Sequence, residues 1–167
     1  MRRVFTIVAV AGTTVALLTP AAGASGNNRW VPFRNQPFTS SGVCSFTVHG
    51  DILQDEEEIR TDGTFPDGSP RIQEFRGPLV IRFTNTDNGK SAVRDLSGYG
   101  RVHNFANGGS AWYFNGGFSV RIRAGNSAYP AGWYILHGKG WLTIAPDNTR
   151  DFPVLHADIE NLCDTLA

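Results

Sequence analysis

The chain has 167 residues, of which 41% are hydrophobic, and its 15 basic residues are matched by 15 acidic residues. This length and hydrophobic content predict one domain that is large enough to bury a proper core. The balanced charge excludes the basic surplus that is typical of nucleic-acid binders. It also argues against attachment to a membrane surface through a polybasic segment.

Residues 1–24 have the three parts of a signal peptide. Arg2 and Arg3 form a positive start, residues 4–18 are mostly apolar, and residues 22–24 offer the small side chains that a signal peptidase requires. The apolar run is shorter than the roughly 20 residues of a membrane-spanning helix. We therefore expect cleavage near Ala24 and a secreted, extracellular protein without a membrane span, exported by the Sec or the twin-arginine route.

Residues 25–41 are polar and interrupted by prolines, and they contain Trp30, Phe33 and Phe38. They show neither the helical nor the strand period, so we predict an extended N-terminal arm. Three aromatic residues are too many for a freely solvated segment. We expect them to pack against the outside or one end of the domain.

Residues 42–167 form the predicted domain, because apolar and polar side chains alternate there in short segments, as in half-buried strands. The alternation is clearest in residues 44–52, 79–84, 118–123 and 155–160. Turn sequences such as Asp67-Gly68 separate the segments, and no long helical period follows the signal peptide. The pattern predicts an all-β fold: an antiparallel up-and-down barrel of about eight strands, with a β-sandwich as the alternative.

Two glycine-rich segments affect the number of strands. Residues 91–105 are expected to form one strand that bends at Gly98-Tyr99-Gly100, since glycine inside a strand often marks a bend. Residues 133–136 and 141–144 are expected to form two short strands joined by a hairpin at Gly138-Lys139-Gly140.

Cys44 and Cys163 are predicted to form a disulfide that closes the barrel, because an even number of cysteines without metal-binding spacing is typical of secreted domains. Cys44 opens the first predicted strand and Cys163 ends the last, and both fall on the apolar face of their strands. These strands are antiparallel neighbours in an up-and-down barrel with an even number of strands. Stepping along both strands by two residues places His49 opposite Asp158 and Asp51 opposite His156.

This cross-strand polar patch of His49, Asp51, His156 and Asp158 has three interpretations. A solvent-facing ladder of opposite charges is favoured, because such pairs commonly stabilise antiparallel strands. A metal site and a general acid–base pair are the alternatives.

The sequence contains no motif that assigns a catalytic, metal-binding or cofactor-binding residue, and we expect no cofactor. The acidic run Asp55–Glu58 and the spacing Asn85-x-Asp87-x-Gly89 supply only part of a calcium loop, so both are predicted to be solvated turns. His103 and His137 are isolated and are interpreted as structural residues.

Aromatic residues gather in the second half of the domain. Most are expected to fill the core, because a barrel of about eight strands is just wide enough to be filled by side chains. The alternatives are an apolar ligand cavity and an outward aromatic surface for a protein or a glycan. The residues predicted to line such a cavity are Trp112, Phe114, Phe118, Trp133 and Trp141.

Residues 84–91 read Thr-Asn-Thr-Asp-Asn-Gly-Lys-Ser, and Leu96-Ser97-Gly98 follows them. This segment resembles a group of small secreted actinobacterial β-barrel proteins that share a TN…GK hairpin and an SG bend. The resemblance rests on turn residues. It implies a secreted β fold, and it implies no catalytic residues because the group has no assigned function.

These observations favour a secreted, non-enzymatic binding protein whose unknown partner is a small apolar molecule or another protein, and not a nucleic acid. The first alternative is an extracellular enzyme resembling the barrel cyclases, which need few catalytic groups. The second is a secreted inhibitor or effector that presents its N-terminal arm or a hairpin loop. Charged side chains inside the domain would favour the enzyme, and an apolar interior would favour the binding protein.

Overall fold

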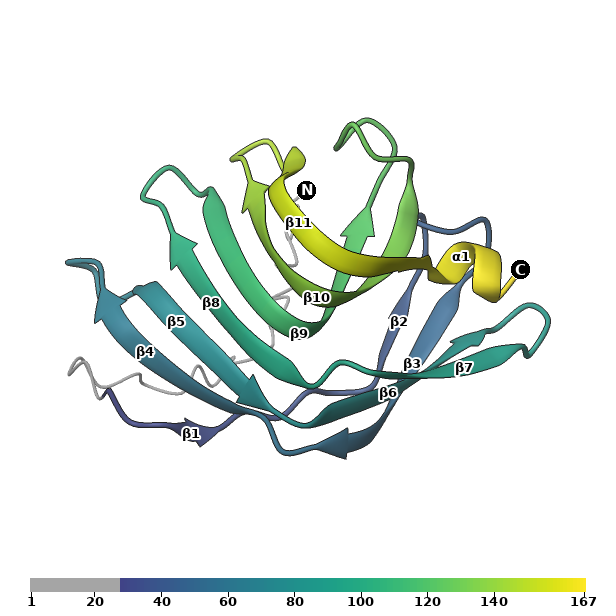
Figure 1. Ribbon diagram of the computed structural model, residues 1–167, viewed down its shortest axis with the longest axis horizontal. Helices are drawn as coiled ribbons and strands as arrows, with labels where there is room; N and C mark the ends of the chain where they lie inside the picture. Colours follow the sequence, from purple (N-terminus) through teal and green to yellow (C-terminus); the bar gives the residue numbers. More distant parts are fainter. Residues whose placement is uncertain (1–27) are drawn as a thin grey trace, which may run out of the picture.

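The structure of the protein is a computed structural model in which residues 28–167 are described. The predicted signal peptide, residues 1–24, and the start of the predicted arm lie outside the described residues. The described chain is all-β, as predicted, with two antiparallel sheets and one short helix (Figure 1). None of the helical segments within residues 28–167 is long and apolar enough to cross a membrane.

The larger sheet contains seven of the strands, and the smaller sheet contains four. In spatial order, the larger sheet consists of β1 (Val31–Pro32), β4 (Glu58–Thr64), β5 (Pro70–Gly77), β8 (Gly98–Asn104), β9 (Ser110–Ile122), β10 (Gly132–Ile144) and β11 (Arg150–Asn161). The smaller sheet consists of β2 (Phe38–Ser40), β3 (Val48–Asp55), β6 (Leu79–Asn85) and β7 (Ser91–Asp95). Helix α1 (Leu162–Thr165) follows the last strand.

The chain passes directly from one sheet to the other at three corners: between β3 and β4, between β5 and β6, and between β7 and β8. At the second corner Pro78 follows Gly77, and proline ends a strand ladder because it has no backbone N–H group. The strand predicted over residues 91–105 is divided at the third corner, Leu96-Ser97, which immediately precedes the predicted bend. Each corner separates a long extended segment into two strands.

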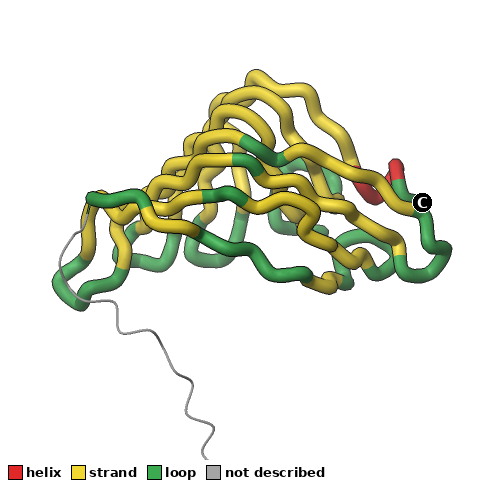
Figure 2. The backbone as a smooth tube through the Cα atoms, turned by 90° about the horizontal axis from the view of Figure 1, so that it is seen from below, coloured by secondary structure: helices red, strands yellow, loops and turns green. Residues whose placement is uncertain are grey.

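Strand β9 folds back sharply at Gly116-Gly117. The rings of Phe114 and Phe118 stack with centroids 4.6 Å apart, although four residues of a regular strand span about 13 Å. Gly116 has a φ of +115°, and a Cβ atom on Gly117 would lie 2.5 Å from the backbone of Leu96. Glycine is therefore needed at both positions, and the two halves of β9 form opposite arms of a curved sheet (Figures 1 and 2).

Strand β10 is continuous over 13 residues, so the hairpin predicted at Gly138–Gly140 is wrong. Gly138, with a φ of +150°, lies opposite Gly116 in the ladder. The glycines of β10 therefore let this strand follow the bend of β9, whereas the sequence pattern predicted a reversal of the chain. Glycine is typical of both a bend within a strand and a turn between strands. Only the pairing with the neighbouring strand shows which of the two is present.

The core has two parts that share the first half of β10. Trp133 and Ile135 pack with the smaller sheet and α1, whereas Tyr134 and Leu136 pack inside the folded larger sheet. All four side chains are buried. This segment is therefore a middle layer that is covered on both faces, which explains why its sequence is continuously apolar.

The N-terminal arm packs against the domain, as expected. Trp30 lies beneath the guanidinium groups of Arg60 and Arg76, at 4.8 and 4.1 Å from the ring centroid. Phe38 stacks on Trp133 with a centroid distance of 5.7 Å. The arm also contributes β2, which pairs with β3.

The predicted pairing of the first and last long strands is wrong. Strand β3 lies in the smaller sheet between β2 and β6, whereas β11 lies at an edge of the larger sheet and pairs only with β10. The physical reason is that the arm occupies the edge of β3 beside Val48–Gly50. His49 and Asp51 are therefore not opposite Asp158 and His156.

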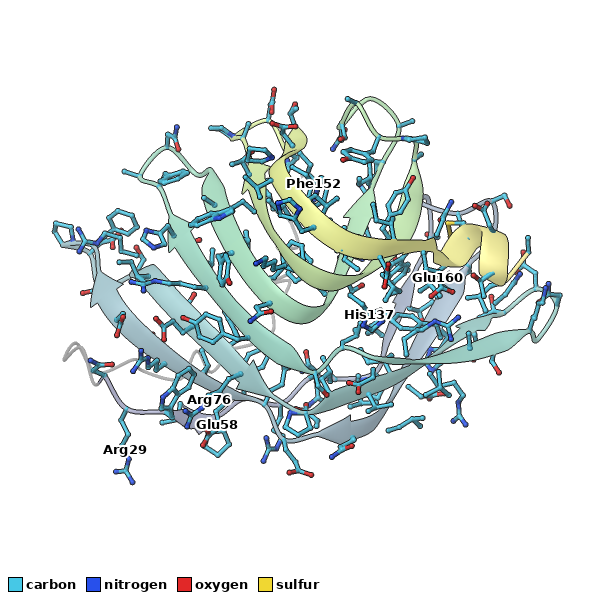
Figure 3. The ribbon with its side chains drawn as sticks, in the orientation of Figure 1. Arg29, Glu58, Arg76, His137, Phe152 and Glu160 are labelled. Atoms are coloured by element: carbon cyan, nitrogen blue, oxygen red, sulfur yellow. A yellow bond between two sulfur atoms is a disulfide. The ribbon has the colours of Figure 1, made fainter. Side chains whose placement is uncertain are left out.

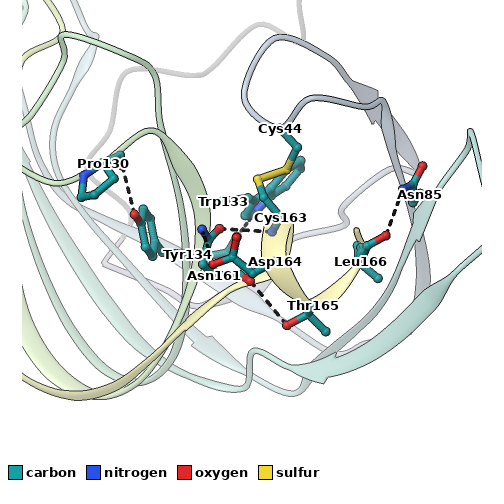
Figure 4. Close-up of a disulfide and its surroundings, with 11 residues drawn as sticks. Cys44, Asn85, Pro130, Trp133, Tyr134, Asn161, Cys163, Asp164, Thr165 and Leu166 are labelled. Carbon is teal, nitrogen blue, oxygen red and sulfur yellow. Dashed lines mark hydrogen bonds between the residues drawn. A yellow bond between two sulfur atoms is a disulfide. The ribbon is translucent and has the colours of Figure 1, made fainter.

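The predicted disulfide is present, although neither cysteine lies in a strand. The Cα atoms of Cys44 and Cys163 are 5.2 Å apart; Cys44 lies in a bend before β3, and Cys163 lies in α1 (Figure 4). Asn85 Nδ2 donates to the carbonyl oxygen of Leu166 at 2.9 Å. The carbonyl oxygens of Leu166 and Ala167 also accept from Asn88 Nδ2 and Lys90 Nζ, at 3.3 and 3.0 Å. The C-terminal segment is thus fixed to the smaller sheet and its loops by one covalent bond and several polar contacts.

The strand ladders of residues 28–167 do not close into one barrel, because each sheet keeps two edge strands. The edges formed by β7 and β11 are joined by side chains. Arg94 Nη2 and Nε donate to Glu160 Oε1 and Oε2 at 2.5 and 2.6 Å. This ion pair raises the pKa of Arg94 and lowers the pKa of Glu160.

Candidate ligand-binding cavity

A cavity of about 340 Å³ lies where the two sheets separate. Strand β8 pairs with β9 only from Gly98 to Asn104, opposite Gly116 to Ser110. Beyond that point β7 joins the smaller sheet, and the second half of β9 pairs only with β10. The cavity opens at this division, and Phe33 and Asn35 of the arm form part of its wall.

Five aromatic rings line the cavity: Phe33 from the arm, Phe75 from β5, Tyr99 from β8, and Trp112 and Phe118 from β9. Phe75 contacts Phe33 edge to face and stacks on Trp112, with centroid distances of 5.6 and 5.9 Å. The centroids of Trp112 and Phe118 are 6.2 Å apart. All five side chains are partly exposed, so a ligand that enters the cavity can reach them.

Glu57 is the one carboxylate among the described residues that line the cavity. Burial raises the pKa of Glu57, and nearby Asp55 adds to this rise, whereas a hydrogen bond from Asn35 opposes it. Asn35 Nδ2 donates to Glu57 Oε2 at 2.6 Å. The cavity therefore combines a largely apolar wall with one carboxyl group whose pKa is raised by burial.

The structure brings together two of the five aromatic residues that were predicted to line a cavity, Trp112 and Phe118. Phe114 is buried behind them and stacks on Phe118. Trp133 fills the core beside the smaller sheet. The alternation of β9 places Trp112, Phe114 and Phe118 on one face, but only the bend at Gly116-Gly117 decides which of them reach the cavity.

Trp141 lies on the outer face of the larger sheet and is 42% exposed. Its ring centroid is 5.4 Å from that of Tyr113, which is 6.3 Å from that of Tyr99. Trp141 and Tyr113 are thus separate from the aromatic wall of the cavity. Tyr99 belongs to both groups, because it also borders the cavity.

The predicted polar patch is not assembled. His49 Nε2 lies 3.2 Å from Asp51 Oδ1 within β3, and Asp51 pairs with Arg82 across to β6 at 3.1 Å. On the other sheet, His156 lies opposite Lys139, and Asp158 opposite His137. Within residues 28–167, no group of three or more potential ligands among His, Cys, Asp and Glu is placed to hold a metal ion.

Sequence reasoning missed four important residues of the cavity: Phe33, Asn35, Glu57 and Phe75. Phe33 was recognised only as part of a packing arm. Glu57 belongs to the acidic run that was interpreted as a solvated turn, but in the structure it forms the corner between β3 and β4 and is only partly exposed. No local pattern could place these residues together, because they meet only through the pairing of β4, β5 and the arm.

No protein-family model, no curated protein and no solved structure matches this chain. We therefore infer function from the cavity and its side chains.

Proposed function

We propose that this protein is a secreted, non-enzymatic binding protein that holds a small, largely apolar molecule in the aromatic cavity. The observation that carries the proposal is a cavity of about 340 Å³ whose wall contains five partly exposed aromatic rings and one carboxylate. Small-molecule sites commonly have volumes of roughly 300–1,000 Å³, apolar walls and a few polar groups that orient the ligand. Glu57 is the polar group here, and it accepts a hydrogen bond from the polar end of the ligand.

The disulfide between Cys44 and Cys163 supports secretion, since such bonds persist mainly in oxidising compartments. The order of the strands supports an open form of an up-and-down barrel. Each pair of strands joined at a corner, such as β3 and β4, can be taken as one long bent strand. Each long strand then pairs with the next one in the chain: β3 with β6 and β4 with β5, β6 with β7 and β5 with β8, and then β8, β9, β10 and β11 in order. A sandwich of the Greek-key type would instead need a long connection between non-consecutive strands.

One observation favours an enzyme of the barrel-cyclase kind as the second candidate. Glu57 has a raised pKa inside the cavity, as a general acid requires. The only hydrogen-bond partner of its carboxylate within residues 28–167 is the Asn35 side chain, which supplies no second acid or base. The inhibitor hypothesis is less favoured, because the aromatic residues of the arm pack against the domain.

The proposal is tested by titration with the neutral fluorescent probe N-phenyl-1-naphthylamine. We expect saturable binding with increased probe emission, and Trp112→Leu should weaken it about tenfold, which corresponds to about 1.4 kcal/mol. Trp141→Leu is the matched control, because Trp141 lies outside the cavity. Absence of binding to the wild type, or equal weakening by both substitutions, would contradict the proposal.

A further inference from the structure

Three arginine side chains line a second pocket of about 310 Å³: Arg121 and Arg123 at the end of β9, and Arg150 at the start of β11. The other lining residues are Val43, Asn126, Asp147 and Asn148. Only Asp147 opposes the three positive charges, so the pocket carries an excess of positive charge. The whole chain, by contrast, has equal numbers of acidic and basic residues.

The pocket forms where two loops that are distant in sequence meet. The backbone N–H of Arg150 donates to the carbonyl oxygen of Asn126 at 2.6 Å. The carbonyl oxygen of Asn148 then accepts from Arg150 Nη1 at 2.9 Å and from Asn126 Nδ2 at 3.3 Å. These contacts hold the loop after β9 against the β10–β11 turn, so the arginines are brought together by defined hydrogen bonds.

None of the three arginines forms an ion pair with a carboxylate within residues 28–167, whereas Arg60, Arg76, Arg82, Arg94 and Arg101 all do. Arg121 donates to Ser40 Oγ at 3.1 Å and lies over the Trp133 ring. The Arg123 guanidinium group has no hydrogen-bond partner among the described residues, and only its backbone carbonyl oxygen accepts a bond, from the N–H of Asn126 at 3.1 Å. The Asp147 carboxylate accepts from the backbone N–H of Thr149 at 2.9 Å and leaves the guanidinium groups unneutralised.

The electrostatics agree with this geometry. Burial lowers the pKa of Arg150, and the positive charges of Arg121 and Arg123 lower it further. Like charges that are held together at a partly buried site disfavour the folded state unless an anion neutralises them. Guanidinium groups are suited to this role, because their planar N–H donors match the oxygens of phosphate and related anions.

We propose that this arginine pocket binds a tetrahedral oxyanion, a phosphate or sulfate group carried by a small molecule or present as the free ion. Arg123 and Arg150 donate hydrogen bonds to its oxygens, and Arg121 adds positive charge from above Trp133. The pocket is lined by none of the residues of the aromatic cavity. The inference therefore does not depend on the function proposed for that cavity.

Isothermal titration calorimetry with inorganic phosphate, and separately with sulfate, tests the proposal at constant ionic strength. We expect saturable binding of at least one anion by the wild type. Arg123→Gln should weaken that binding about tenfold. Arg71→Gln is the matched control, because it removes the same charge from an exposed residue of β5 outside the pocket.

Thermal unfolding supplies a second readout. Without added anion at low salt, Arg123→Gln should unfold at a higher temperature than the wild type, because it relieves repulsion among the arginines. Phosphate or sulfate should reduce or reverse this difference by stabilising the wild type more.

Two results would overturn the proposal. One is that neither anion binds the wild type better than chloride does. The other is equal weakening by Arg123→Gln and Arg71→Gln, which would show an adventitious ion only. Binding of phosphate without sulfate, or of sulfate without phosphate, supports the proposal and identifies the group that the pocket prefers.

Discussion

At the scale of single residues, Glu57 shows how one side chain links the cavity to folding. It is the carboxylate of the corner between β3 and β4, and its pKa is raised above the ordinary value of 4.5 mainly by burial. Its neighbour Glu58 begins β4 and does not line the cavity. Glu58 pairs with Arg76 at 2.8 Å (Figure 3). Consecutive glutamates therefore have different environments, because alternation along an extended chain points them in opposite directions.

Replacing Glu57 with glutamine should change stability in a pH-dependent way. A raised pKa means that the folded state binds the proton more tightly than the unfolded state does. The stabilisation that protonated Glu57 gives to the folded state is therefore complete below pH 4.5, the ordinary carboxyl pKa. It is lost as the pH rises through the raised pKa of Glu57 in the folded state. Glu57→Gln should unfold about 2 °C higher than the wild type near neutral pH. In strongly acidic buffer the two should unfold at the same temperature.

Thermal melts at both pH values measure this difference. Glu56→Gln is the control, because Glu56 is exposed and interacts with Gln54 at 3.0 Å. A wild type that is more stable than Glu57→Gln near neutral pH would contradict the explanation by burial.

At the scale of elements, the bend in β9 decides both the core and the cavity. It stacks Phe114 on Phe118, and it allows the corner between β7 and β8 to approach the chain at Gly117. A straight β9 would place Trp112 and Phe118 about 20 Å apart, since six residues separate them. The aromatic wall of the cavity therefore depends on two glycines that do not themselves supply a ring.

Gly117→Ala should destabilise the protein by about 2–3 kcal/mol. The new Cβ atom would lie 2.5 Å from Leu96 Cα and 2.7 Å from the carbonyl oxygen of Asp95, and backbone atoms cannot move away cheaply. Gly100→Ala in β8 is the control, because its nearest neighbour would be 3.9 Å away. Denaturant unfolding measures both variants, and equal stability of the two would show that β9 does not need glycine at its bend.

At the scale of the whole molecule, the two sheets are joined at their corners, through the core around Trp133 and Ile135, and through the C-terminal segment. The disulfide connects residues 119 positions apart. Around it, Asn85 contacts Leu166, and Arg94 contacts Glu160. These contacts lie where a continuous barrel would have backbone hydrogen bonds, so the covalent bond has a large share in holding the smaller sheet to β11 and α1.

Replacing both cysteines with serine should lower the free energy of unfolding by about 4–5 kcal/mol, the value expected when a loop of this length loses its cross-link. The strands should still form, because both cysteines lie outside the strands. Denaturant unfolding measures the loss, and far-ultraviolet circular dichroism measures the strand content. Reduction of the wild type should have the same effect, since it has no free cysteine among the described residues. An unchanged unfolding midpoint would show that side-chain contacts alone hold the sheets together.

The all-β class, the disulfide and the packing of the arm's aromatic residues could be predicted from the sequence alone. These follow from local or chemical signals: the period of two in segments such as residues 79–84, the even number of cysteines, and the concentration of aromatic residues in residues 30–38. Such signals state which side chains are buried. They do not state which strands are neighbours, because every strand with the same alternation is an equally suitable partner.

Tertiary structure alone decided the pairing and both pockets. The arm occupies the edge of β3, and β3 and β11 lie in different sheets, so His49 is not opposite Asp158. The aromatic cavity arose where β7 leaves the larger sheet, and the arginine pocket arose where two distant loops meet. The physical reason is the same in each case: the site depends on contacts between segments far apart in the chain, and the packing of the whole molecule selects those contacts.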